Sequence, residues 1–156
     1  MKEKKSLNVQ LLIEKLKQIK AKDIMTENVI TVRKNESLAD IAELMIKKRI
    51  SGFPVVEDDQ IIGIITANDL FLVMDMIKTG DIPKNNGDGC SSDVSFVMST
   101  EIFSAGPETD LDEIISLIKY RNIHTLPIVD HNKLVGVIGR RDVFNYFYLS
   151  VKDCCQ

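Results

Sequence analysis

The 156-residue sequence contains no tryptophan and only three cysteines, and aromatic residues make up 6% of it. The cysteines, Cys90, Cys154 and Cys155, are odd in number and two are adjacent, so they provide neither a disulfide framework nor a Cys-x-x-Cys metal or redox pair. The two histidines, His124 and His131, lie at no spacing that would complete a zinc site with them. We therefore expect a reduced, cytoplasmic protein without a bound metal or cofactor.

Long apolar runs and a strong charge of one sign are also absent. The N-terminus MKEKKSLNVQ has no apolar segment behind its charges, and no stretch approaches the ~18 apolar residues of a membrane span. We therefore expect neither a signal peptide nor a membrane partner. The net charge of −3 and the pI near 5.4 argue against nucleic acid as a partner. With 44% hydrophobic and 28% charged residues, the composition is typical of a globular protein.

An internal repeat organises the chain. A shift of 73 residues aligns the sequence with itself without a gap over ~48 residues, so that Met25 matches Met98 and Asp69 matches Asp142. The chain is therefore predicted to contain two copies of one unit. The predicted segments are an N-terminal amphipathic helix (1–21), a first repeat (22–79), a linker rich in Gly, Asn, Asp and Ser (80–94), a second repeat (95–150) and a tail (151–156).

Each repeat is predicted to have the element order β-α-β-β-α. Ser37 with Asp40, and Asp110 with Glu113, form capping signatures that start the first helix of each repeat. A second helix follows the last strand. The strands, recognised by their Ile and Val content, are expected at Val29–Val32, Phe53–Val56, Ile61–Ile65, Ile102–Ala105, Leu126–Val129 and Leu134–Ile138.

Leu7–Lys20 places apolar residues at helical spacing with lysines on the other face. Two interpretations are open: a helix packed on the repeats, which we favour, or a helix lying on a membrane surface.

The motifs of the repeat resemble the cystathionine-β-synthase (CBS) domain, in which a helix ending before a Pro-Val-Val strand is followed by a Gly-x-x-Thr-x-x-Asp turn. The first repeat has Ile50-Ser-Gly-Phe-Pro-Val-Val and Gly63-Ile-Ile-Thr-Ala-Asn-Asp, and the second has Ile123-His-Thr-Leu-Pro-Ile-Val and Gly136-Val-Ile-Gly-Arg-Arg-Asp. The resemblance implies an α/β fold of two β-α-β-β-α CBS repeats with pseudo-two-fold symmetry, to which the N-terminal helix is added. It also implies two clefts between the repeats, where many members bind AMP, ADP, ATP or S-adenosylmethionine.

Thr66 and Asp69 have two interpretations. Thr-x-x-Asp is a capping-box signature, so both residues could serve only to begin the second helix. A helix N-terminus also offers free N–H groups to a phosphate, and a carboxylate one turn later can accept both hydroxyls of a ribose. The resemblance favours ligand binding, because this Asp is the family's ribose contact and this Thr a phosphate-side contact. For the first cleft it implies a set in which the apolar members hold adenine or are simply core: Ile50, Phe53, Thr66, Asp69, Met98 and Phe103.

The second repeat departs from this pattern. Gly139 replaces the threonine, and Arg140 and Arg141 follow it, either to bind a phosphate or to form a solvated charged face. His124 resembles the phosphate-contacting histidine in the γ subunit of AMP-activated protein kinase, although it could instead stabilise a helix C-terminus. For the second cleft the resemblance implies Met25, Ile30, Ser51, His124, Arg140, Arg141 and Asp142. We expect the Asp69 cleft, which keeps both polar groups, to bind ribose better.

No Ser/His/Asp or Cys/His pair lies at catalytic spacing and no Walker lysine is present, so we expect no enzymatic activity. The resemblance implies a stand-alone regulatory module that binds an adenine nucleotide, senses ligand or energy state and signals to an effector protein. A binder of S-adenosylmethionine and a scaffold without a nucleotide are the alternatives. A homodimer is expected from the apolar second-helix faces, namely Phe71, Val73, Met74, Ile77, Phe144, Phe147 and Tyr148.

Overall fold

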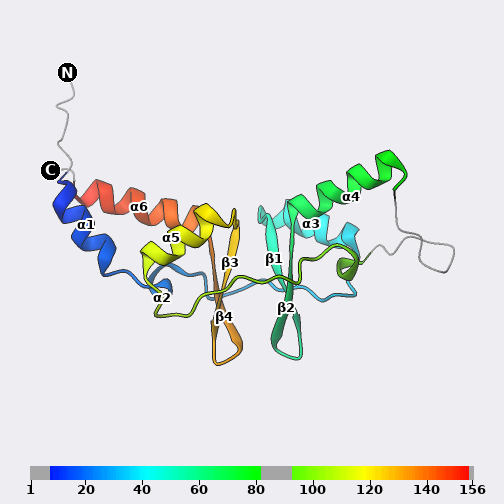
Figure 1. Cartoon of the computed structure of the whole chain (residues 1–156), viewed down its shortest axis with the longest axis horizontal. Coiled ribbons are helices and arrows are strands. Elements are labelled where there is room, and N and C mark those ends of the chain that lie inside the picture. Colours follow the sequence, from blue (N-terminus) through cyan, green and yellow to red (C-terminus); the bar gives the residue numbers. More distant parts are fainter. Residues whose placement is uncertain (1–7, 82–92, 155–156) are drawn as a thin grey trace, which may run out of the picture. The chain divides into compact units, whose positions relative to one another are not determined.

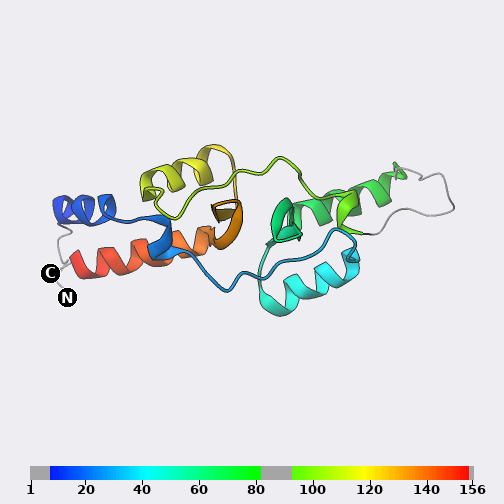
Figure 2. The same ribbon diagram turned by 90° about the horizontal axis from the view of Figure 1, so that it is seen from below.

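A computed structural model of the chain describes residues 8–81 and 93–154 and contains, within them, six α-helices and four β-strands (Figures 1 and 2). The chain divides into two compact units: unit 1 comprises residues 1–29 and 103–156, and unit 2 comprises residues 30–102. The chain therefore starts in unit 1, builds unit 2 and returns to unit 1. The linker predicted at 80–94 lies mostly outside the described residues.

Unit 2 is built on a β-hairpin with a helix before it and a helix after it. Asp58 and Asp59 form its two-residue turn, and both have positive φ angles, which such turns require. Ser37 caps the first helix as predicted, since its Oγ accepts a hydrogen bond from the Asp40 N–H at 3.1 Å. The elements are α3 (Leu38–Lys48), β1 (Gly52–Glu57), β2 (Gln60–Thr66), α4 (Ala67–Thr79) and a 3-10 turn (Val94–Phe96).

The predicted strand Val29–Val32 is reduced to one bridge. Val32 pairs in parallel with Val55, and its N–H and C=O bond to the neighbouring residues of β1. Immediately afterwards the Arg33 N–H bonds to the side chain of Glu36, and the Glu36 N–H bonds to the Arg33 carbonyl. These local bonds turn the backbone away from β1, so the extended segment stops after one bridge.

Unit 1 repeats the plan of unit 2 and adds helices from the N-terminus. Its hairpin turns through His131 and Asn132, which again have positive φ angles. The predicted strand Ile102–Ala105 contributes only the bridge between Ala105 and Ile128. The elements are α1 (Val9–Lys17), α2 (Ala21–Ile24), α5 (Leu111–Tyr120), β3 (Thr125–Asp130), β4 (Lys133–Gly139) and α6 (Arg140–Cys154).

Helix α1 is shorter than the predicted Leu7–Lys20 and packs on α6 and α5 (Figures 1 and 2). Asn8 caps it, Leu12 is buried, and Lys15 lies 3.6 Å from the carboxylate of Asp153.

The prediction that the side chain of Asp110 caps the first helix of the second repeat is wrong. Asp110 occupies the N-cap of α5, but its carboxylate forms an ion pair with the Lys20 ammonium instead of a hydrogen bond to the helix backbone. A full positive charge is a stronger partner than a backbone N–H.

The two hydrophobic cores use equivalent residues of the two repeats, and each includes one residue from the segment that leads into the other repeat. Ala21, which precedes the first repeat's strands, is buried in the core of unit 1 with the second repeat. Val94, 73 residues later, is buried in the core of unit 2 with the first repeat. The remaining equivalent core pairs are Ile41 and Ile114, Phe53 and Leu126, Val55 and Ile128, and Ile65 and Ile138. The repeats therefore exchange their leading segments, and neither unit is complete without the other repeat.

Candidate functional site

The N-terminus of α4 follows β2 directly and is held by the Asp69 carboxylate. The Thr66 N–H and the Thr66 hydroxyl both donate to Asp69 Oδ2, at 2.6 and 2.9 Å, and both residues are half-buried. The Ala67 N–H donates to the Ser51 carbonyl at 2.8 Å, which fixes the loop after α3 against this helix end. Within the described residues, the other carboxylate oxygen, Oδ1, takes part in none of these hydrogen bonds. The capping role therefore leaves one oxygen of Asp69 for another partner.

The N-terminus of α6 has the same geometry with one fewer donor. The Gly139 N–H donates to Asp142 Oδ2 at 2.7 Å, and no hydroxyl accompanies it. A Cβ added at Gly139 would lie 3.5 Å from Asp142 Oδ2 and 3.7 Å from the His124 carbonyl oxygen, both ordinary contacts. The half-buried His124 thus has its backbone beside the start of α6, as Ser51 has beside the start of α4.

The two arginines predicted to act together have different surroundings. Arg140 donates from Nη2 to Asn122 Oδ1 at 2.9 Å and from Nε to the Ile123 carbonyl at 3.4 Å, so it ties the loop after α5 to α6. Arg141 is exposed and forms no hydrogen bond or ion pair within residues 8–81 and 93–154. Of these two arginines, Arg141 is therefore the one that residues 8–81 and 93–154 leave free to meet an anionic ligand.

The first glycine of each Gly-x-x-x-x-x-Asp motif accommodates a methionine of the exchanged segment. A Cβ on Gly63 would lie 2.9 Å from both Met98 Sδ and the Ser99 carbonyl oxygen, and a Cβ on Gly136 would lie 2.5 Å from Met25 Sδ. Such distances are too short for real carbon contacts. The glycines are therefore explained by close packing inside each unit.

The residues predicted to line one cleft do not all lie in the same unit. Unit 2 contains Ile50, Phe53, Thr66, Asp69 and Met98 of the first set and also Ile30 and Ser51 of the second set. Unit 1 contains Met25, His124, Arg140, Arg141 and Asp142 of the second set and also Phe103 of the first set. Each predicted set therefore draws on both units, and its convergence stays a prediction.

The apolar members of the sets differ in how much surface they offer. Phe53 is only 1% exposed and belongs to the core of unit 2, whereas Ile30, Ile50 and Met98 are partly buried against that core. The ring of Phe103 lies 5.0 Å from the Arg121 guanidinium in a cation–π contact. Phe53 is consequently the member whose core role is plainest.

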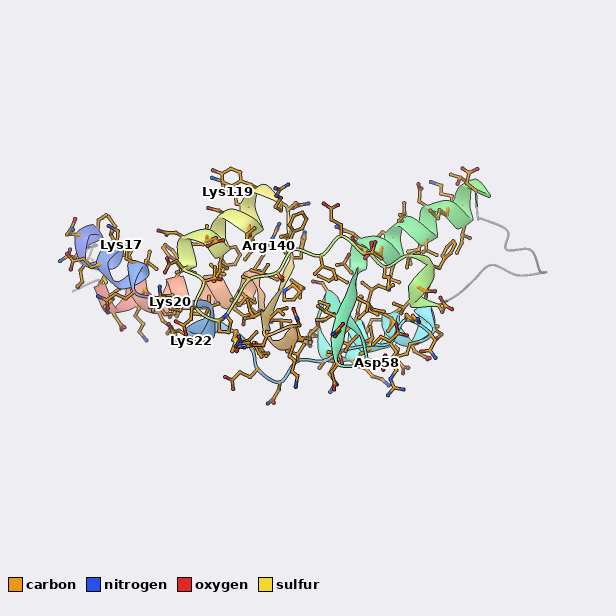
Figure 3. All side chains as sticks on the ribbon, turned by 60° about the horizontal axis from the view of Figure 1, so that its bottom comes forward. Lys17, Lys20, Lys22, Asp58, Lys119 and Arg140 are labelled. Atoms are coloured by element: carbon orange, nitrogen blue, oxygen red, sulfur yellow. The ribbon has the colours of Figure 1, made fainter. Side chains whose placement is uncertain are left out.

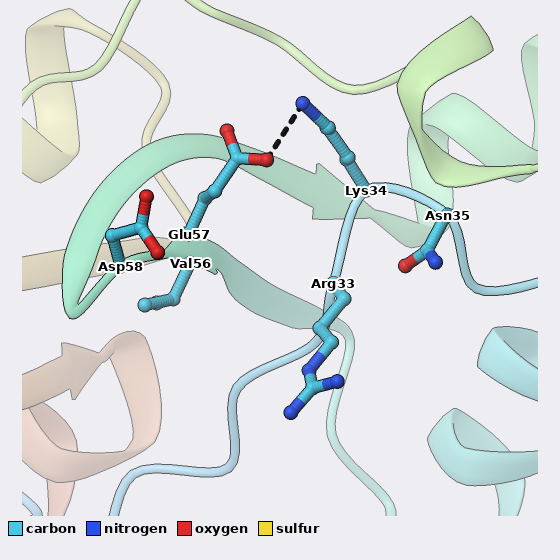
Figure 4. Close-up of a pocket in the computed structure, with 6 residues that line it drawn as sticks. All are labelled: Arg33, Lys34, Asn35, Val56, Glu57 and Asp58. Atoms are coloured by element: carbon cyan, nitrogen blue, oxygen red, sulfur yellow. Dashed lines mark ion pairs between the residues drawn. The ribbon is translucent and has the colours of Figure 1, made fainter.

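A polar pocket of about 420 Å³ lies in unit 2 near the turn of its hairpin, away from these helix ends (Figure 4). Lys34 and Glu57 pair across it at 2.7 Å, and this hydrogen bond raises the pKa of Lys34 above its ordinary value. The sequence does not point to this pocket, because its two halves lie about twenty residues apart and are brought together by the bridge between Val32 and Val55. Its lining residues are Arg33, Lys34, Asn35, Val56, Glu57 and Asp58.

Two kinds of feature are absent from residues 8–81 and 93–154. No group of three His, Cys, Asp or Glu side chains there is placed to hold a metal ion. In the same ranges no helix combines the length and the apolar character needed to cross a membrane.

Comparisons with known proteins match both repeats. A family model described as the CBS domain matches residues 21–75 and 92–149. The CBS domain-containing protein YhcV of Bacillus subtilis is 35% identical over 123 residues, which cover 78% of this chain and 81% of YhcV. Inosine-5'-monophosphate dehydrogenase of Thermoplasma acidophilum is 32% identical over 133 residues. That match covers 84% of this chain but 24% of the enzyme.

Solved structures share the fold. The structure of CBSX2 in complex with AMP has a TM-score of 0.71 at 23% identity, covering 85% of this chain and 98% of CBSX2. The CBS domain pair of protein MJ0100, in complex with 5'-methylthioadenosine and S-adenosyl-L-methionine, has a TM-score of 0.69 at 23% identity. Its alignment covers 83% of this chain and 96% of that one.

Proposed function

The chain belongs to the CBS-domain family as a tandem pair, and from this premise we propose that it is a regulatory module that binds an adenosine-type ligand. The observation that carries the proposal is the geometry of Asp69 and Asp142. Each uses Oδ2 for the helix cap and keeps Oδ1 outside the capping hydrogen bonds of the described residues. A half-buried carboxylate with one free oxygen at a helix N-terminus suits the hydroxyls of a ribose.

We propose an adenine nucleotide, AMP, ADP or ATP, as the ligand whose phosphates meet Arg141. An exposed guanidinium that has no partner among the described residues can bind a phosphate in bidentate fashion at little desolvation cost. His124 and the free N–H groups at the start of α6 belong to the same unit and add further donors. The AMP bound in the CBSX2 structure supports this choice by fold.

S-adenosylmethionine is a second candidate, favoured by the start of α4. Ala67 and Asn68 stand where α6 has its two arginines, so the first turn of α4 carries no cation. A ligand with a sulfonium group in place of phosphates meets no like charge there. The S-adenosylmethionine bound in the MJ0100 structure supports this possibility by fold.

The module is proposed to act without catalysis, in the cytoplasm, by changing its affinity for an effector protein when ligand binds. A ligand produces such a change only if it prefers one arrangement of the module. The alignment with inosine-5'-monophosphate dehydrogenase is confined to a quarter of that enzyme and therefore carries no argument for the same activity here.

A homodimer is proposed from the apolar side chains that remain exposed on α4 and α6. Phe71 and Met74 are each 63% exposed and Phe144 is 68% exposed, which is unusual for residues of this size. The further exposed members of these faces are Leu72, Ile77, Phe147, Tyr148 and Leu149.

The proposal is tested by calorimetric titration with AMP, ATP and S-adenosylmethionine, each at low and moderate salt. Binding of AMP or ATP that Arg141→Ala weakens supports the nucleotide, whereas binding of S-adenosylmethionine alone supports the second candidate. If none of the three ligands gives heat or raises the melting temperature, the proposal is wrong and the scaffold alternative replaces it.

A further inference from the structure

The polar pocket at the hairpin of unit 2 is built on backbone that other parts of the unit hold in place. Both backbone groups of Val32 bond to β1, which joins the two halves of the pocket. The Arg33 N–H donates to a side-chain oxygen of Glu36 at 2.8 Å, and the Ser95 N–H donates to the Lys34 carbonyl at 2.9 Å. The side chains that line the pocket therefore start from a fixed frame, which lowers the entropic cost of binding a ligand.

Four charged side chains line this pocket, and two of them pair with each other. Lys34 Nζ lies 2.7 Å from Glu57 Oε1, whereas Figure 4 shows the Arg33 side chain pointing away from that pair. Asp58 lies at the turn between β1 and β2 (Figure 3). Among residues 8–81 and 93–154, the Arg33 guanidinium and the Asp58 carboxylate take part in no hydrogen bond or ion pair. One positive and one negative group are thus left for a ligand.

The mixture of charges selects the kind of ligand. The pKa of Lys34 is raised first by its hydrogen bond with Glu57 and further by the charges of Glu57 and Asp58, so the Asp58 charge acts inside the pocket. A ligand with only a negative charge would be repelled by Glu57 and Asp58, and one with only a positive charge by Arg33 and Lys34. A small zwitterion, which carries both charges, meets an attractive partner for each.

Unit 1 has different side chains at the equivalent place. Under the shift of 73 residues, Arg33, Lys34 and Asn35 correspond to Gly106, Pro107 and Glu108. Glu108 is already paired, because Lys22 of α2 (Figure 3) lies 2.5 Å from its carboxylate. The backbone is equivalent, since the Lys22 N–H donates to the Pro107 carbonyl at 2.9 Å. The charges of the pocket therefore belong to the sequence of unit 2 and do not follow from the fold.

We propose that this pocket binds a free α-amino acid. The carboxylate of the amino acid meets the Arg33 guanidinium, whose planar fork suits two parallel hydrogen bonds, and its ammonium group meets the Asp58 carboxylate. The Asn35 amide, which also has no hydrogen bond among the described residues, can both donate to and accept from a side-chain amide of the ligand. The volume of about 420 Å³ lies within the ~300–1,000 Å³ that is typical of small-molecule sites.

The pocket is separate from the helix start that carries Asp69. Its lining residues lie beside the hairpin turn, where Glu57 pairs with Gln60. Thr66 pairs with Gly52 at the opposite end of the same hairpin, directly before α4. The amino-acid site therefore goes beyond the adenosine ligand proposed above and gives the module a second small-molecule input.

Titration of the full chain with L-glutamine, followed in the backbone amide spectrum by NMR, tests the proposal. We expect saturable shifts at Lys34, Asn35 and Asp58 with a dissociation constant on the order of 1 mM, because each exposed charge pair is weak. Two analogues each remove one charge: N-acetyl-L-glutamine lacks the ammonium group, and L-glutaminamide lacks the α-carboxylate. Each should bind about fivefold more weakly or worse. An unchanged spectrum up to tens of millimolar L-glutamine, or an analogue that binds as tightly as L-glutamine, overturns the proposal.

Paired substitutions give an independent readout, with a matched control for each charge. Arg33→Gln should weaken L-glutamine binding about tenfold and Asp58→Asn about fivefold, while the melting temperature stays close to that of the starting protein. Lys48→Gln is the control for an exposed cation of unit 2 outside the pocket. Asp59→Asn is the control within the same turn, since Asp59 also has a positive φ but does not line the pocket. Equal losses for Asp58→Asn and Asp59→Asn, or an unchanged affinity in Arg33→Gln, would refute the proposed contacts.

Titration with AMP on the same samples separates this site from the adenosine site. AMP should leave the amides of Lys34, Asn35 and Asp58 unshifted and should not displace L-glutamine; displacement would contradict a separate pocket. Absent AMP binding together with saturable L-glutamine binding supports the amino-acid site and refutes only the adenosine ligand.

Discussion

Replacing the Asp69 carboxylate separates a ligand-binding role from a capping role, because the structure assigns the cap to one oxygen. Asp69→Ala removes the acceptor for both the Thr66 N–H and the Thr66 hydroxyl, which should cost about 1 kcal/mol of stability. It also removes the proposed acceptor for ribose hydroxyls, and a hydrogen bond to a charged group contributes roughly 1.5–3 kcal/mol. The dissociation constant for an adenosine ligand should therefore rise on the order of ten- to a hundredfold.

The matched control is Ser37→Ala at the start of α3. It removes a cap whose Oγ accepts one hydrogen bond at 3.1 Å, and it lies outside both predicted sets. Its loss of stability should therefore resemble that of Asp69→Ala while ligand affinity stays unchanged. Asp69→Asn adds a second comparison, since an amide oxygen can still cap the helix without the negative charge.

The assay is isothermal titration calorimetry beside thermal melting without ligand. Thermal melting measures the stability that the cap contributes. Calorimetry measures the ligand affinity, to which both the cap and the ligand contact can contribute. If Asp69→Ala lowers the melting temperature as Ser37→Ala does but leaves ligand affinity unchanged, Asp69 is only a cap and the site assignment fails.

Three further predictions follow from the same geometry. Arg141→Ala should weaken ATP binding about tenfold and more strongly at low salt, with little effect on a ligand without phosphates; Lys152→Ala serves as the control, and equal losses for both ligands would contradict a phosphate contact. Gly139→Thr should raise the melting temperature by an amount equivalent to roughly 0.5–1 kcal/mol, because its Cβ fits and its hydroxyl can add the donor that Thr66 supplies in α4; a lower melting temperature would show that the position is strained. Gly63→Ala should destabilise unit 2 by about 1–3 kcal/mol in denaturant unfolding, because the new Cβ would meet the Ser99 carbonyl at 2.9 Å; an unchanged midpoint would contradict the packing described.

The repeat made much of the fold predictable. Runs rich in Ile and Val located the four strands of the described residues to within about two residues, because β-branched side chains favour buried strands. The capping signature at Ser37 was correct because its hydrogen bond is local. Structural features that depend on residues close together in the sequence can therefore be predicted from the sequence.

The rest depends on contacts between distant segments. Ala21 and Val94 are buried with the opposite repeat, and nothing in their local sequence distinguishes this exchange from packing on their own repeat. Asp110 has the sequence of a helix cap, yet Lys20, ninety residues away, takes its carboxylate. The Ser51 carbonyl accepts a hydrogen bond from the first turn of α4, and the grouping of Ser51 with Asp142 stays a prediction from the family resemblance.

The most direct test of the central claim is the backbone amide spectrum of the protein, recorded by NMR as AMP is added. Free N–H groups at a helix start shift strongly when they meet a phosphate or a nearby charge. We predict saturable shifts for Asn68 at α4 or for Arg140 and Arg141 at α6, with the hairpin turn at Asp58 unaffected. A spectrum that does not change at either helix start, up to millimolar AMP, ATP and S-adenosylmethionine, would contradict adenosine binding by this CBS pair.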